Sequence, residues 1–202
     1  MQLYKPNKSI KGSALSVNFT ARADGDNGKG DKSFYFQLIS QTGWDDKSGN
    51  GTFKDGKKII VKFAPHEISG MLSAIKRNTT LADVMGVQYV YHDGDKSASN
   101  INFGPHFKKE KKGEQWVDTD KQLGFGLRVT KTDKQNKENK DSIGIALNWA
   151  EVELLELFLK DGLSHIFNSW FSENINRLKK GKEAKQEIAE PAPQPENDDK
   201  EF

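Results

Sequence analysis

A strand-into-helix pattern that occurs twice constrains this chain more than any other feature. Ile59–Leu72 reads IIVKFAPHEISGML, and Ile143–Glu156, 84 positions further on, reads IGIALNWAEVELLE. Alternating apolar residues at the start of each stretch indicate a half-buried strand, and helical apolar spacing follows. Two copies of one unit predict two similar halves that each end in a helix.

Both predicted helices begin with recognisable signals. Pro65 suits the first helical turn, and Glu67 places a carboxylate there. Asn148 and Glu151 form the pattern of a capping box at the start of the second helix. The first helix then carries a single apolar stripe, formed by Ile68, Met71, Leu72 and Ile75.

The second helix is apolar over a wider arc than one sheet requires. The residues concerned are Val152, Leu154, Leu155, Leu157, Phe158 and Leu159. A second apolar face normally packs on something else. Two occupants fit equally: a partner subunit, or the following segment Leu163–Phe171 folding back on the helix.

Strand signals alternate with turn clusters along the rest of the chain. They fall at Lys11–Phe19, Ser33–Ser40, Lys57–Phe63, Gly86–Asp93, Asn100–Lys109, Gln122–Lys131 and Ser142–Leu147. Alternation between polar and apolar residues is typical of strands with one solvated face. The order of strands, helix, strands and longer helix predicts an α+β fold.

The charge is divided unevenly along the 202 residues. Residues 183–202 hold seven acidic residues against two basic ones, so the net charge of +2 leaves an excess of seven positive charges on residues 1–182. A basic body indicates a polyanionic partner, although a soluble domain with a solvated tail has the same charges. We expect a folded domain over residues 1–178 and a disordered acidic tail over 179–202.

The last residues of the chain resemble a docking peptide. Acidic residues precede a terminal aromatic, and the residues are Asp198, Asp199, Glu201 and Phe202. The sequence predicts that this tail binds partner proteins.

Several classes of chemistry lack their residues. The chain has no cysteine, its four histidines are scattered without metal-ligand spacing, and no nucleophile or phosphate-binding motif occurs. No apolar run is long enough to cross a membrane. We therefore expect no catalytic residue, metal, cofactor or membrane contact, with a DNA-processing enzyme or its accessory subunit as the alternative.

Basic and aromatic residues remain as the candidate binding groups. Cations neutralise phosphates, and exposed rings stack on unpaired bases. The candidates are Lys11, Tyr35, Trp44, Lys57, Lys58, Phe125, Arg128 and Lys131.

Five stretches in order resemble the Whirly family of single-stranded DNA-binding proteins. They are Lys11–Val17, Phe63–Leu72, Tyr91–Asn100, Leu127–Asn136 and Asn148–Trp170. The first is similar to the opening K-G-x-A-A-L-S-V of that family, with Ser13 where a lysine is usual. The second matches its strand-to-helix junction, and the last matches its final helix.

The resemblance implies a specific architecture. Each half would hold a four-stranded antiparallel sheet followed by a helix, ββββα repeated twice. Protomers would form a homo-oligomer, a tetramer with the helices inside. Single-stranded DNA would lie between sheets of neighbouring protomers with little sequence preference.

The acidic tail is instead similar to that of bacterial and phage single-strand-binding proteins. That likeness implies a role in DNA replication, recombination or repair, with partner proteins of those processes docking on the tail, in the cytoplasm of a bacterium or of a phage-infected host. An RNA-binding or annealing protein and a transcription regulator on melted promoter DNA are the alternatives.

Overall fold

The structure is a computed structural model that describes residues 1–22, 30–77 and 88–189, with side chains up to residue 180. Its strands are β1 (Gln2–Lys5), β2 (Ser13–Arg22), β3 (Asp31–Ser40), β4 (Gly43–Asp45), β5 (Asn50–Thr52), β6 (Lys58–Phe63), β7 (Gln88–Asp93), β8 (Ser97–Lys112), β9 (Gln115–Asp133) and β10 (Lys140–Asn148). Its helices are α1 (Pro65–Lys76) and α2 (Trp149–Ala189).

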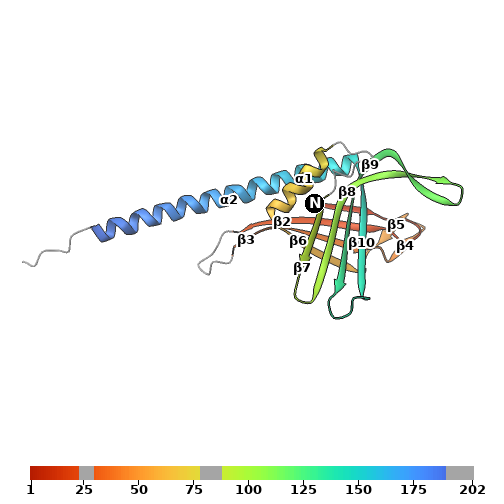
Figure 1. The fold of residues 1–202 in the computed structure, drawn as a ribbon, viewed down its shortest axis with the longest axis horizontal. Coiled ribbons are helices and arrows are strands. Elements are labelled where there is room, and N and C mark those ends of the chain that lie inside the picture. The colour runs from red at the N-terminus through yellow and green to blue at the C-terminus, as the bar shows by residue number, and fades with distance from the viewer. Residues whose placement is uncertain (23–29, 78–87, 190–202) are drawn as a thin grey trace, which may run out of the picture.

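Two four-stranded antiparallel sheets make up the body. The first has the strand order β1-β2-β3-β6, the second has the order β10-β9-β8-β7, and β4 and β5 form a separate hairpin. In Figure 1 the strands of the first sheet run across the view and those of the second run down it. A helix follows each sheet along the chain, so the predicted α+β fold with ββββα repeated twice is confirmed.

Alternate residues of both sheets point into one shared core. In the first sheet Val17 pairs with Phe36 across the strands, and in the second Ile101 pairs with Val129 and Val129 with Ile143. All of these side chains are buried in a single cluster with residues from both helices. Because strand side chains alternate, the intervening residues form the outer face of each sheet.

The predicted helix starts are present. Glu67 accepts a hydrogen bond from the Ala64 N–H at 2.7 Å. At α2, Asn148 Oδ1 accepts from the Glu151 N–H at 3.0 Å, and Glu151 Oε2 accepts from the Asn148 N–H at 2.8 Å. This reciprocal arrangement is a capping box, which satisfies backbone donors that a helix start leaves unpaired.

The second helix is longer than the sequence suggested. Leu163–Phe171 continues α2 as helix, so the alternative in which this segment folds back on the helix is wrong. The helix also runs on to Ala189, so residues 179–189 are helical although they lie within the expected tail. Lys, Glu, Ala and Gln dominate that stretch, and each favours helix without needing a core. The predicted docking residues Asp198, Asp199, Glu201 and Phe202 lie outside the described residues.

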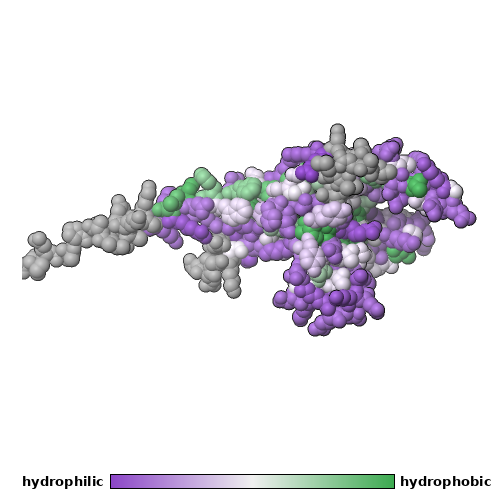
Figure 2. Space-filling model, in the orientation of Figure 1, coloured by the Kyte–Doolittle hydropathy of each residue, from purple (hydrophilic) through white to green (hydrophobic). Residues whose placement is uncertain are grey.

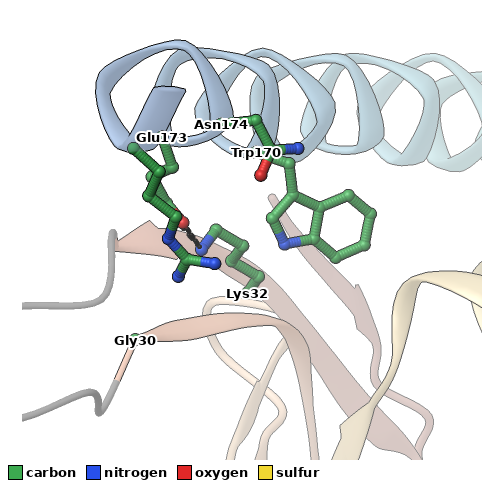
Figure 3. Close-up of a pocket in the computed structure, with 6 residues that line it drawn as sticks. Gly30, Lys32, Trp170, Glu173 and Asn174 are labelled. Atoms are coloured by element: carbon green, nitrogen blue, oxygen red, sulfur yellow. Dashed lines mark hydrogen bonds and ion pairs between the residues drawn. The ribbon is translucent and has the colours of Figure 1, made fainter. Parts of the chain in front are cut away.

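A polar brace fixes the direction in which α2 leaves the body. Lys32 of β3 forms a largely buried ion pair with Glu173 at 2.7 Å, and the Ser169 hydroxyl donates to the Ala21 carbonyl at 2.9 Å. Figure 3 shows Lys32 reaching up from the sheet to α2, with Trp170 beside it. The hollow around this pair measures about 290 Å³.

Candidate nucleic-acid interface

The outer face of the second sheet presents four strands of side chains that do not enter the core. Pairing across β7, β8, β9 and β10 places these residues in rows: Asp93, Ala98, Thr132 and Lys140; Tyr91, Asn100, Thr130 and Ser142; Tyr89, Asn102, Arg128 and Gly144; and Gly104, Gly126 and Ala146. Residues up to 57 positions apart in sequence thus share one surface.

Three adjoining hollows lie on this face. The first, of about 620 Å³, lies between Lys11 and Arg128 over the glycine row. The second, of about 380 Å³, shares Asn102 and Arg128 with the first, and the third, of about 430 Å³, shares Tyr91 and Asn100 with the second. We call the surface that these three adjoining hollows form the sheet groove.

The charges that line the sheet groove are mainly positive. Its cations are Lys11, Arg128, Lys134, Lys137 and Lys140, and its carboxylates are Asp93 and Asp133. The excess is therefore three positive charges. Lys134 forms an ion pair with Asp93 at 2.5 Å, which places one of the two carboxylates against a cation. A cation-rich groove attracts a phosphate backbone.

The floor of the first hollow has almost no side chains. Gly104, Gly126, Gly144 and Ala146 meet there on three adjacent strands. A Cβ added at Gly126 would have no neighbour closer than 4.0 Å, so the space above it is open. A bound chain can approach backbone closely at such a position.

Two tyrosines rise from the edge strand β7 beside the groove. The side chains of Tyr89 and Tyr91 are 70% and 60% exposed. Sequence reasoning did not select them, although the alternation in QYVYHD carries the signal, because Val90 between them points to the core. Exposed rings at the rim of a cationic groove are suited to stacking on bases.

Of the predicted aromatic residues, Phe125 is excluded from any such surface. Its side chain is fully buried and packs on Phe103, with the ring centroids 5.1 Å apart. The prediction that Phe125 stacks on bases is therefore wrong. Strand alternation places it with Leu127 on the inner face, while Arg128 points outward.

Tyr35 lies on the outer face of the first sheet and is engaged within the chain. Its hydroxyl donates to Asp31, and the Lys62 ammonium lies 5.7 Å from the centre of its ring. The Tyr35 hydrogen bond and the Lys62 cation lower the pKa of Asp31, and the Asp31 carboxylate raises the pKa of Lys62. A base would have to compete with Lys62 for this ring.

Lys11 reaches the sheet groove from a loop that one buried glutamine organises. Gln41 Oε1 accepts from the Asn7 and Gly12 N–H groups at 2.9 and 3.1 Å. Its amide donates to the carbonyls of Asn7 and Gly43 at 2.9 and 2.7 Å. The sequence offered no signal for this role, because the four bonded backbone groups belong to Asn7 and Gly12, which precede β2, and to Gly43, which follows β3.

The remaining predicted residues lie apart from the groove. Trp44 sits on the β4–β5 hairpin, where its indole N–H donates to Asp46 at 3.1 Å. Lys57 pairs with Asp141, and Lys58 lies on the outer face of the first sheet. Lys131 projects from the face of β9 opposite to Arg128. Lys11 and Arg128 are thus the two predicted residues that the structure places in the groove.

Comparison with known proteins gives a match in structure but not in sequence. No family model matches the chain, and no curated protein matches it. The crystal structure of WHY1 from Arabidopsis thaliana superposes with a TM-score of 0.54 and 16% identity over 90% of each chain. WHY3 from Arabidopsis thaliana gives 0.54 and 17% over 87% of this chain and 93% of that one. The plant transcriptional regulator PBF-2 gives 0.57 and 13% over 86% and 93%.

The chain has the Whirly fold. The likeness covers 90% of the chain, so the resemblance seen in the sequence is confirmed at the level of architecture. At identities of 13–17% it is a likeness of fold. Function is therefore argued from the groove itself.

Proposed function

We propose that this Whirly-fold chain is a non-catalytic protein that binds single-stranded DNA along the sheet groove, largely without sequence preference. The observation that carries the proposal is that three adjoining hollows bring cations, exposed tyrosines and a glycine floor together across four strands. Cations would track the phosphates while Tyr89 and Tyr91 stack on unpaired bases.

The shape of the groove favours a single strand over a duplex. Stacking on a side chain requires bases that are not already stacked in a helix, which a single strand supplies. The described residues that line the groove belong to strands and loops, and none of them forms a helix that could enter a duplex groove. Stacking and phosphate contacts are common to all bases, so sequence preference should be small.

Several observations favour binding over catalysis. Among the described residues, no group of three or more His, Asp or Glu is placed to hold a metal ion. Among the residues that the structure describes, the groups whose pKa values their surroundings displace are Asp31, Asp45, Lys62 and Glu110, and none of them lines the groove. Catalytic sites usually concentrate such groups.

No helix in the described parts of the chain combines the length and apolar character that a bilayer crossing needs.

The biological process has three candidate assignments. Replication, recombination or repair follows from the acidic tail, and the solved structure of a plant transcriptional regulator with this fold favours a regulator on melted promoter DNA. An annealing factor for RNA is the third reading. Competition between DNA and RNA oligonucleotides of one sequence separates the last reading from the first two.

Titration of a fluorescent oligo-dT at several salt concentrations tests the proposal. Each phosphate contact contributes about −0.7 to the slope of log affinity against log salt, so the five groove cations set a limit of about −3.5. A duplex of equal length and a non-specific acidic peptide serve as controls. Tighter binding to the duplex, or no binding at low salt, contradicts the proposal.

The acidic tail is proposed to bind partner proteins and to compete with DNA for the cationic groove. Like charges on tail and nucleic acid make the two exclusive on one surface. A chain ending at residue 189 should bind oligo-dT more tightly than the full chain and lose partner recruitment. If the shortened chain keeps both its DNA affinity and its partner recruitment, the tail neither competes with DNA nor binds partners.

The chain is also proposed to assemble as a homo-oligomer through α2. Trp149, Leu154, Leu157, Phe167, Phe171, Ile175 and Leu178 are large apolar side chains exposed along this helix. Figure 2 shows hydrophobic surface along α2 where it extends from the body. Exposed apolar surface of this extent marks an interaction site.

A further inference from the structure

The edge strand β7 differs from the other three edges of the two main sheets. Edge strands expose unpaired backbone groups, and proteins usually guard them with lysine, proline or very short length. Lys5 lies in the four-residue β1, Lys58 and Lys62 lie in β6, and Lys140 lies in β10. β7, with the sequence QYVYHD, carries neither lysine nor proline.

The inner face of β7 is partly covered. Val90 belongs to an inner row with Ile101, Val129 and Ile143, which are all buried. Val90 is only partly buried against the same cluster. No described strand pairs with the outer edge of β7. On this inner face α1 contacts β7, where His92 bonds to Glu67 at 2.8 Å, so the backbone edge is the part of β7 that the described residues leave unpaired.

We propose that β7 pairs antiparallel with β7 of a second copy of this chain, with the two-fold axis at Val90. This register sets Val90 against Val90, Tyr89 against Tyr91 and Gln88 against His92 of the second copy. Opposed residues lie on the same side of a sheet, so inner residues meet inner residues. Moving the axis to residue 89 or 91 would leave one tyrosine-to-tyrosine pair in place of two and would oppose Gln88 or His92 to valine.

The strand is self-complementary in this register. Aromatic residues opposed across strands stabilise a sheet, and here two such pairs form on the outer face. The amide of Gln88 faces the imidazole of His92, which also bonds to Glu67 of its own chain, and no charge faces a like charge. A two-fold arrangement uses the same patch on both copies, which suits a patch that completes itself.

The pairing would complete the binding site, and this consequence rests on the proposed function. The second hollow of the sheet groove reaches Tyr89, Val90 and Tyr91 at the β7 edge. Two paired copies form one eight-stranded surface in which the two grooves meet at four tyrosines. A single strand crossing the junction would stack on residues of both copies.

Disulfide trapping tests the pairing without nucleic acid. The chain has no cysteine, so Val90→Cys introduces a single thiol. At a two-fold axis the introduced thiol faces the equivalent thiol of the second copy, at a distance that a disulfide spans. Mild oxidation should convert most of the protein to a covalent dimer on a non-reducing gel. Ile60→Cys, on the lysine-guarded edge strand β6, is the matched control and should cross-link at least tenfold more slowly.

The outcomes separate this inference from the proposed function. Cross-linking of Val90→Cys no faster than that of Ile60→Cys overturns the pairing, provided circular dichroism shows that both variants are folded. Tyr91→Cys, which would face a tyrosine, checks the register and should cross-link more slowly than Val90→Cys. A trapped dimer that binds no oligonucleotide would support the β7 pairing and contradict the proposed function. A protein that binds oligonucleotide but is not trapped would support the function and contradict the pairing.

Discussion

Arg128 is the side chain at which the first two hollows of the sheet groove meet. Arg128→Ala should weaken oligo-dT binding by roughly threefold to tenfold at low salt and reduce the salt slope by about 0.7. Lys131→Ala removes a cation from the same strand on the opposite face, so it should leave both values unchanged. Anisotropy titrations of the two variants measure the difference, and equal losses would argue against the groove.

The Asp31, Tyr35 and Lys62 group makes stability depend on pH. The pKa of Asp31 is lowered by Tyr35 and Lys62, so its contribution is present above the ordinary aspartate pKa and is lost as pH falls through the lower folded value. The pKa of Lys62 is raised by Asp31, so its contribution is lost only as pH rises through that higher value. The contribution of this group therefore spans the interval between these two pKa values.

Asp31→Asn should remove this dependence. We expect the free energy of unfolding to fall by about 1 kcal/mol at neutral pH, since one partner is partly exposed. Denaturation between about pH 2 and pH 7 should then show a smaller acid loss than the natural chain. Glu110→Gln, at an exposed ion pair with Lys108, is the control and should change stability little. An unaltered acid profile in Asp31→Asn would contradict the assignment.

The residues of the site were harder to predict than the elements that carry them. Arg128 and Phe125 were selected on residue type, and strand alternation alone decides that one points outward and the other inward. Tyr89 and Tyr91 satisfied the same rule but were not chosen. Alternation separates the two tyrosines from Val90, but the residue type of an aromatic side chain does not say which of the two faces the sheet buries.

Among the elements, the loop that carries Lys11 depends on Gln41. Gln41→Ala would leave two N–H groups and two carbonyls without this partner, so we expect a loss of about 2 kcal/mol or more in stability. Gln37→Ala, on the half-exposed outer face of β3, should be nearly neutral. Urea denaturation measures both, and equal small effects would show that the loop is held by other contacts.

The contact of α2 with the first sheet depends on a glycine. A Cβ at Gly162 would lie 2.6 Å from Cε1 of the buried Phe34 and 3.0 Å from Cδ1 of Phe19. Alanine gains up to about 1 kcal/mol in helix propensity, but overpacking costs about 1–3 kcal/mol, so Gly162→Ala should destabilise the fold. Ser164→Ala, exposed on the same helix, should be neutral or slightly stabilising. Thermal unfolding that shows Gly162→Ala to be the more stable variant would contradict this packing.

Element boundaries followed the sequence where local signals exist. The capping box at Asn148 and Glu151 and the start at Pro65 are short-range patterns, and both hold in the structure. The path of α2 was not readable in this way. Its continuation through Leu163–Phe171 is fixed by packing on Phe34 and by the Lys32–Glu173 brace, which join residues more than 120 positions apart.

At the scale of the whole molecule, the exposed apolar side chains along α2 indicate an interface with a partner. Phe171 and Leu178 are 69% and 68% exposed. Replacing both with glutamate should lower the solution mass measured by light scattering, because buried carboxylates are costly. Ser172→Glu adds one charge on another face of the helix and should leave the mass unchanged. A monomeric natural chain, or an unaltered mass in the double variant, would show that α2 does not form the interface.

The fold as a whole was more predictable than its assembly into a groove. Two strand-into-helix units predicted two halves, and the resemblance across five motifs supplied the number of strands. The groove unites Lys11 with residues as distant as Ala146, and it exists only because β2 and β10 lie together, where the Ser13 hydroxyl donates to the Gly144 carbonyl at 2.7 Å. No local pattern encodes such a meeting.

The bare floor of the groove makes this protein adaptable as a reporter. Because the space above Gly126 is open, a cysteine there should be accepted by the fold, and it would be the single thiol of the chain. An environment-sensitive dye attached at that thiol would sit under any bound strand. Its emission would report whether the groove of each protomer is occupied. A larger substituent at the same position would block the groove and provide a folded control that does not bind.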